Sequence, residues 1–245
     1  MQKKLLSIPD IIKTGWELYI ENFQKFLIPI VIVISPYIIF YLLQYLEGAA
    51  ISILFLITFV LIIMIELWMT IFFIETINYI YNQQTFDLNK IYENAFKKIS
   101  SYFWVSILTA LIVTVGIIVF LIPGLIFAVW FSFSSYINVL EGQKGSKAIA
   151  ASKELVRGRW GATFWRLIIP PLFIYAISMM IIFALTYMFT GGNINSESIE
   201  QSILVNALFT LIFSILTPLL VSFNVIIYNN LKKTKSNLED QTLPL

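Results

Sequence analysis

The chain has 245 residues, of which 59% are hydrophobic and 12% are charged, and its mean hydropathy is +0.85. About a quarter of the residues of a soluble domain are charged, so this composition excludes a water-soluble globular protein and predicts a polytopic membrane protein. Cysteine and histidine are both absent. Their absence excludes disulfides, thiolate nucleophiles, histidine-ligated haem and zinc sites with the usual ligands.

Six apolar runs are long enough to cross a hydrocarbon core about 30 Å thick. They are residues 26–46, 49–74, 103–122, 124–140, 163–190 and 203–228. The third and fourth runs form one stretch from Tyr102 to Leu140 that is broken only at Ile122-Pro123-Gly124. Each half would be ~27 Å long as a helix. This stretch therefore forms either two short spans or a re-entrant hairpin.

The sixteen Lys and Arg residues lie before the first run, between the second and third, between the fourth and fifth or just inside the fifth, and after the sixth. The three alternate connections, including GGNINSESIE after Thr190, contain none. Because positively charged connections stay in the cytoplasm, we expect a multi-pass protein of the plasma membrane with both termini cytoplasmic. The basic flanks on both sides of residues 102–140 require this stretch to cross the membrane twice or not at all.

Each odd-numbered run follows a segment in which apolar and charged residues alternate at helical spacing. These segments are residues 11–23, 88–99 and 146–157. They predict amphipathic helices that lie in the cytoplasmic interface. We expect each to turn into the membrane near Phe23, Phe103 and Phe164, although the middle copy lacks the base and the proline found at the other two entries.

The predicted fold is therefore all-α, a polytopic membrane protein whose six transmembrane helices form three parallel hairpin repeats. Each repeat is preceded by a cytoplasmic interfacial amphipathic helix. One integral membrane domain covers residues 1–230, with repeats at about 7–81, 86–141 and 145–229, and residues 231–245 form a disordered cytoplasmic tail. Since each unit crosses the membrane twice, the copies are parallel and are not the inverted repeats of many secondary transporters.

The stretch from Ile122 to Phe164 contains three turn and membrane-entry motifs, Pro123-Gly124, Leu140-Glu141-Gly142 and Gly158-Arg159-Trp160. With them, most of the chain resembles the membrane-domain family attached to some bacterial glycerophosphoryl diester phosphodiesterases, and its free-standing multi-spanning bacterial relatives. The resemblance implies an architecture. It implies no reaction, because the phosphodiesterase activity of such fusions belongs to a separate soluble barrel whose metal site needs histidines, and this chain has none.

Five polar residues are candidates for an interior site. Glu66 is the one acid well inside a predicted span; it is either a proton or cation relay or a contact for a substrate amine, or it pairs with Trp, Ser or Asn on a neighbouring helix. Asn78, Asn138 and Asn224 share one predicted level, with Glu141 nearby. They are either structural links between helices or the lining of a polar cup that opens toward the cytoplasm.

Arg157, Arg159 and Arg166 are candidate contacts for anionic lipid headgroups, although topology alone also explains them. We expect the lipid bilayer and other membrane proteins as partners, and no nucleic acid, cofactor, metal or catalytic residue. The sequence thus favours a non-catalytic membrane protein that organises lipid or partners, or a permease-like component. The alternatives are a transporter of a small amphiphile or lipid-related solute and, disfavoured by the missing histidines, an intramembrane lipid-modifying enzyme.

Overall fold

The computed structural model describes residues 5–44, 46, 48, 51–189 and 203–242. All regular structure in these ranges is helical. The helices are α1 (Ile8–Glu21), α2 (Phe23–Leu43), α3 (Ile51–Tyr81), α4 (Leu88–Val119), α5 (Leu121–Phe131), α6 (Ser134–Glu141), α7 (Ser146–Val156), α8 (Trp160–Phe189) and α10 (Ile203–Thr242). The GGNINSESIE connection lies outside the described residues.

Six helical segments are long and apolar enough to cross a membrane, which confirms the prediction of a multi-pass membrane protein. They are Phe23–Leu43, Ile51–Tyr81, Leu88–Val119, Leu121–Glu141, Trp160–Phe189 and Val205–Lys235. Large apolar side chains on their outer surfaces are exposed, among them Ile28, Leu56 and Phe183 at 61–68%. Such a surface is stable in lipid and would be costly in water.

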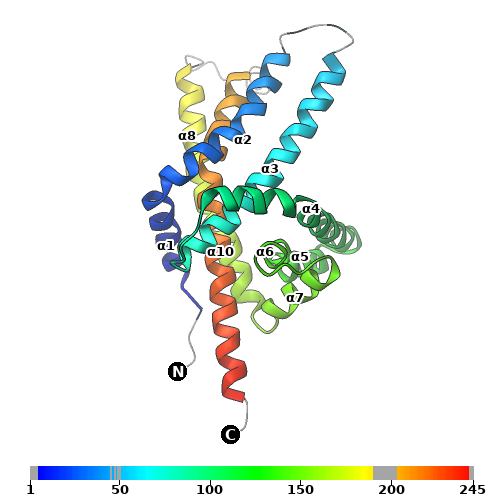
Figure 1. Ribbon diagram of the computed structural model, residues 1–245, viewed down its shortest axis with the longest axis vertical. Coiled ribbons are helices and arrows are strands. Elements are labelled where there is room, and N and C mark those ends of the chain that lie inside the picture. Colours follow the sequence, from blue (N-terminus) through cyan, green and yellow to red (C-terminus); the bar gives the residue numbers. More distant parts are fainter. Residues whose placement is uncertain (1–4, 45, 47, 49–50, 190–202, 243–245) are drawn as a thin grey trace.

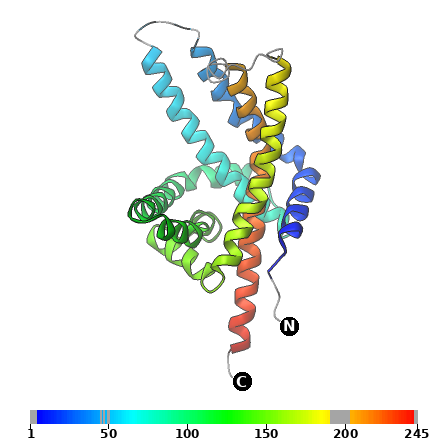
Figure 2. The ribbon, with the colours of Figure 1, turned by 180° about the vertical axis from the view of Figure 1, so that it is seen from behind.

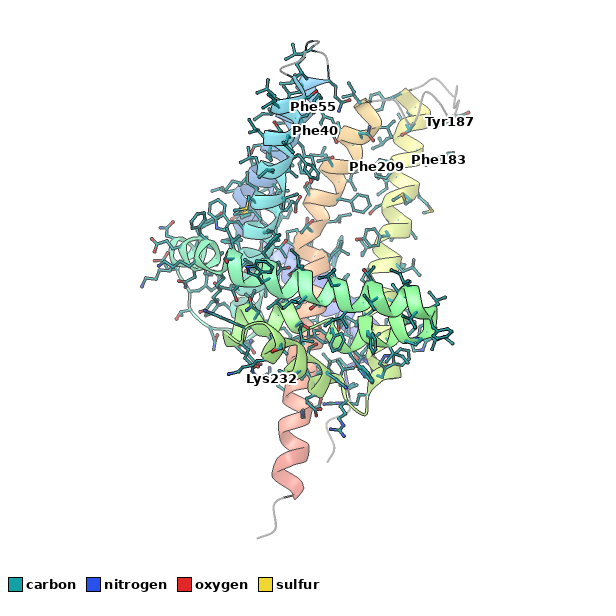
Figure 3. All side chains as sticks on the ribbon, turned by 90° about the vertical axis from the view of Figure 1, so that its right-hand side faces the viewer. Phe40, Phe55, Phe183, Tyr187, Phe209 and Lys232 are labelled. Carbon is teal, nitrogen blue, oxygen red and sulfur yellow. The ribbon has the colours of Figure 1, made fainter. Side chains whose placement is uncertain are left out.

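The six segments do not share one direction. Helices α2, α3, α8 and α10 run roughly along the long axis of the molecule, whereas α4 and α5 lie across it (Figures 1 and 3). Helices α1, α6 and α7 gather with the C-terminal part of α10 toward one end of the four long helices (Figures 1 and 2). We call this end the basic end, because α1, α7 and the last turns of α10 carry lysines.

Helix α1 packs against α10 through one face. Its buried residues are Ile11, Gly15 and Tyr19, spaced four apart, which puts them on one side of the helix. A Cβ at Gly15 would lie 2.5 Å from the ring of Phe223, so glycine is what allows the two helices to come this close. Helix α1 ends and α2 begins at Asn22, next to Phe23, where the sequence predicts a turn.

The two other turns differ from the prediction. Helix α4 runs without a break through Phe103, because this entry contains neither the glycine nor the proline that would interrupt a helix. The third turn comes at residues 157–159, where Gly158 has φ +74°, a conformation that favours glycine. Phe164 consequently lies inside α8 and not at its start.

Helices α4 and α5 form a tight hairpin whose turn is the single extended residue Phe120, with φ −156° and ψ 139°. The predicted break at Ile122-Pro123-Gly124 is therefore displaced, and Pro123 lies in the first turn of α5, where its missing N–H has no intrahelical partner to lose. A Cβ on Gly116 would lie 3.0 Å from the Cα of Gly124. The two glycines thus let the backbones of the two helices meet.

The buried core lies toward the basic end and is rich in aromatic side chains. Its largest fully buried members include Phe26, Phe72, Phe73, Phe133, Phe223 and Tyr228. Helix α10 passes through this core and contacts α1, α2, α3, α7 and α8. It also continues to Thr242, through the segment expected to be a disordered tail, and Leu231 is 1% exposed. The apolar burial of Leu231 extends the packed helix beyond the expected end of the domain.

We expect Gly124→Ala to destabilise the protein by roughly 1–3 kcal/mol. The added Cβ would lie 2.6 Å from the backbone nitrogen and 2.7 Å from the Cα of Ile117, and neither atom can move without opening the hairpin. Gly161→Ala is the matched control, because its Cβ would meet no atom within 4 Å. Unfolding of the purified chains in mixed detergent measures both. Equal stability of the two variants would contradict the tight hairpin.

Candidate functional site: polar contacts at the basic end

Glu66 lies on α3 and is half-buried. Its carboxylate accepts a hydrogen bond of 3.1 Å from the hydroxyl of Tyr37 on α2. The partner is therefore a tyrosine and not the Trp, Ser or Asn that the sequence favoured. The bond links two neighbouring long helices, and it gives the carboxylate a neutral donor in place of water.

A buried ion pair joins α3 to α4 closer to the basic end. The ammonium of Lys98 pairs with the carboxylate of Glu75, whose side chain is 5% exposed. The same ammonium donates a hydrogen bond of 2.7 Å to the carbonyl oxygen of Val139 on α6. A single lysine thus connects three helices. Lys98 lies on the charged side of the amphipathic segment 88–99, and the sequence pattern alone does not indicate this role.

Asn78 belongs to a cluster of three carboxamides. Its side-chain oxygen accepts hydrogen bonds from the amide groups of Asn229 on α10 at 2.8 Å and of Asn82 at 3.1 Å. Asn229 is 7% exposed and also donates to the carbonyl oxygen of Val225. This cluster links the end of α3 to α10. The sequence pattern pointed to Asn224 on α10, but the residue that reaches Asn78 is Asn229, one helical turn after the buried Val225 and Ile226.

Asn138 and Glu141 fasten the short helix α6. Asn138 is 2% exposed, and its amide nitrogen donates to the hydroxyl of Ser101 on α4 and to the carbonyl oxygen of Gln143, both at 2.7 Å. One Glu141 carboxylate oxygen accepts from the Tyr228 hydroxyl at 2.5 Å and from the Lys232 ammonium at 2.8 Å. Through these contacts α6 is held to α4 on one side and to α10 on the other.

Asn224 has a different environment, in which its side chain lies beside Tyr136 of α6. Tyr102 lies close to Tyr136, Ser106 and Ser135. The hydroxyls of these two serines are 3.1 Å apart. Each of the three asparagines singled out by the sequence therefore has its own partners on its own neighbouring helices.

The three candidate arginines also have different partners and do not form one site. Arg159 donates to the Thr234 hydroxyl at 2.5 Å and to the Leu231 carbonyl oxygen, and Arg166 donates to the carbonyl oxygens of Leu6 and Ala162. Burial lowers the pKa of Arg159 from its ordinary value, which lies so far above neutral pH that the group stays charged. Arg157 instead pairs at 3.3 Å with Glu154 at the surface. Arg166 thus holds the chain at Leu6 against α8, and Arg159 holds α10 at Leu231 and Thr234 beside the start of α8.

Among the grooves formed by the described residues, three lie near these contacts. One lies between the end of α3 and the start of α4, and one is an apolar groove of about 430 Å³ between α1, α8 and α10, lined in part by Trp16 and Ser178. The third, where α5, α7 and α8 meet, is lined by Trp130, Lys153, Glu154, Arg157, Gly158 and Trp160. The five interior candidates line none of the three, because their polar groups face other helices. Within the described residues no three acidic, His or Cys side chains are grouped to hold a metal ion.

Comparison of the chain with protein families, with curated proteins and with solved structures finds no match. The resemblance to the membrane domains of glycerophosphoryl diester phosphodiesterases therefore stays a prediction. The chemical role that these contacts support is to hold helices together. They comprise one buried ion pair, several hydrogen bonds of asparagine side chains, and one carboxylate that accepts from both a tyrosine and a lysine.

We expect Lys98→Met to lower the free energy of unfolding by roughly 3 kcal/mol, the lower end for a broken buried pair because the lysine side chain is 35% exposed. The loss arises because the Glu75 carboxylate stays buried without its cation. Lys13→Met is the control, since Lys13 lies 3.9 Å from Glu17 in a fully surface pair, 76% and 52% exposed, and should change stability by less than about 1 kcal/mol.

Adding Glu75→Gln to Lys98→Met should restore part of the loss, because the double variant buries no charge. Unfolding in mixed detergent measures all of these variants. If the single and double variants are equally unstable, the ion pair is not the source of the stability.

Proposed function

We propose that this chain is a non-catalytic integral membrane protein that organises lipid in the cytoplasmic leaflet. The observation that carries the proposal is the direction of the α4–α5 hairpin, which lies across the long helices (Figure 3) while its tip residues Ile118, Phe120 and Ile122 are 78%, 69% and 70% exposed. An apolar surface of this kind needs hydrocarbon around it. A hairpin that lies along the leaflet occupies space among the lipids of one side.

In this arrangement four helices, α2, α3, α8 and α10, cross the bilayer and the hairpin does not. Segregation of lysine and arginine supports cytoplasmic placement of the basic end and of both termini. It also agrees with an even number of crossings, since a hairpin that does not cross returns the chain to the side it came from. The plasma membrane is the proposed location.

The hairpin contacts the basic ends of the crossing helices, and these contacts support its proposed depth in the bilayer. The indole nitrogen of Trp160, the first residue of α8, donates to the carbonyl oxygen of Ile126 on α5 at 3.3 Å. The indole nitrogen of Trp68 on α3 donates to the carbonyl oxygen of Tyr92 on α4 at 3.0 Å. Tryptophan is enriched at the boundary between headgroups and acyl chains, so these bonds favour a hairpin near that boundary.

The bonding of the interior candidates supports a structural role over a solute site. Four of them, Glu66, Asn78, Asn138 and Glu141, hydrogen-bond to other parts of the chain, and Asn224 lies beside Tyr136 of α6. Hydrogen bonds between membrane helices stabilise by about 0.6 kcal/mol on average. The bonds of Glu66 and Asn78 join crossing helices to each other, whereas those of Asn138 and Glu141 fasten α6 to α4 and α10.

The topology is tested with single cysteines, which is simple because the chain has none of its own. A cysteine at Phe120 should be unreactive to an impermeant maleimide applied outside intact cells. Labelled with an environment-sensitive dye and reconstituted, it should be quenched best by lipids that carry the quencher in the cytoplasmic leaflet. Asn195→Cys should react from outside, and Lys147→Cys only after permeabilisation. Reaction of Phe120→Cys from outside would establish six crossings and overturn the proposed leaflet hairpin.

The structural role is tested with Asn229→Leu, Glu66→Gln and Asn138→Ala. We expect Asn229→Leu to lower stability by about 1 kcal/mol in detergent, because it removes the bonds to Asn78 and Val225. We expect Glu66→Gln and Asn138→Ala to leave unchanged the set of small molecules that co-purify with the chain, measured by mass spectrometry. A stoichiometric solute that disappears from either variant while the fold is retained would favour the transporter.

A further inference from the structure

The groove where α5, α7 and the start of α8 meet is a preformed and positively charged site. It has a volume of about 490 Å³ and is lined by Trp130, Lys153, Glu154, Arg157, Gly158 and Trp160. It lies beside the first residue of α8, one of the four long helices. In the arrangement proposed above, this is the level at which the chain enters the bilayer.

The aromatic walls of the groove are held in place by contacts within the protein. The Trp160 ring stacks on Phe164, with ring centres 5.2 Å apart and an interplanar angle of 18°, and its indole nitrogen is hydrogen-bonded to Ile126. On the other wall, the ammonium of Lys153 lies 4.7 Å from the centre of the Trp130 ring, a distance at which cation and ring attract each other. These contacts orient the indoles before any ligand arrives.

The charges of the groove favour an anion. Lys153 and Arg157 outnumber the single acid Glu154, and the ammonium of Lys235 on α10 approaches the same edge, where it donates to the Glu154 carbonyl oxygen at 3.2 Å. The pair between Arg157 and Glu154 is weak, because its two side chains are 76% and 50% exposed. A bound anion can therefore replace Glu154 as the partner of the Arg157 guanidinium at little cost in free energy.

The turn between α7 and α8, next to the groove, is fixed by Arg159, which does not line the groove. Arg159 is bonded to Thr234 and to Leu231 of α10, so the turn between α7 and α8 is tied to a long helix. Gly158 within this turn has φ +74° and no atom within 4 Å of its would-be Cβ. The groove thus stays open beside a turn that is held in place.

We propose that this groove binds the phosphate of an anionic phospholipid headgroup, with Arg157 and Lys153 as its cationic contacts. Guanidinium groups suit phosphate because two N–H groups can meet two oxygens, and tryptophan side chains are enriched at headgroup level. The proposal commits to lipid and not to free phosphate, because α5 continues from Trp130 to exposed Leu125, Ile122 and Leu121 on the hairpin, along which acyl chains can lie. It rests on the proposed function for the depth of the groove.

The test uses the full chain in neutral detergent, titrated with dansyl-labelled phosphatidylglycerol or phosphatidylcholine, with energy transfer from tryptophan as the signal. We expect tighter binding of phosphatidylglycerol, and a loss of roughly twenty-five-fold in Lys153→Gln/Arg157→Gln, about fivefold for each cation removed. The matched control is Lys13→Gln/Lys97→Gln, which removes two exposed positive charges outside the groove and should change the affinity by much less. Glu154→Gln should tighten binding, because it removes the one acid of the groove.

Two outcomes would overturn the proposal: equal affinity for the two lipids, or equal losses in the groove and control variants. Displacement of the probe by inorganic phosphate beyond the effect of chloride at equal ionic strength would assign the groove to free phosphate and overturn the lipid. Melting curves of the variants verify that they fold. Equal affinity for the two lipids with Phe120→Cys still in the cytoplasmic leaflet would refute this site alone, whereas Phe120→Cys reacting from outside would refute the leaflet hairpin and with it the depth proposed for the groove.

Discussion

The arrangement of the basic end depends on one ammonium group that is shared by two acceptors. Lys98 comes from α4, the helix that lies across the molecule, and it reaches the carboxylate of Glu75 on α3 and the backbone of Val139 on α6. A buried carboxylate is strongly unfavourable without a cation, so α4 cannot move away from α3 without leaving a buried charge. The direction of the hairpin follows, since α5 is tied to α4 through glycines and α6 and α7 follow α5 along the chain.

Hydropathy predicted the six apolar segments of this fold, because it is a property of the chain that does not depend on how helices pack. The break between α1 and α2 could also be read from the sequence. The direction of α4 could not, because an apolar run long enough to span a membrane does not specify its tilt, which neighbouring helices set. An apolar helix surrounded by lipid has the same composition whether it crosses a leaflet or lies within it.

The sequence predicts that these polar residues form hydrogen bonds, but it does not predict which residues are their partners. Asparagine and glutamate inside apolar helices must find hydrogen bonds, and this is why Glu66, Asn78 and Asn138 were candidates. Their partners are set by the rotation of each helix about its axis, which one sequence does not provide. Lys98 was missed for a related reason: a lysine on the charged side of an amphipathic segment looks the same whether that side faces water or a buried carboxylate.

The packing of α1 against the last helix affects the order in which the protein assembles. The backbone nitrogen of Leu6 bonds to Asn230 and the Tyr19 hydroxyl bonds to Ile215, across 224 and 196 residues of chain. At synthesis rates of about 5–20 residues per second, the first helix is made roughly 10–45 s before its partner exists. During that interval the apolar face of α1 lacks its partner, so α1 can pack into the bundle only after α10 has been made.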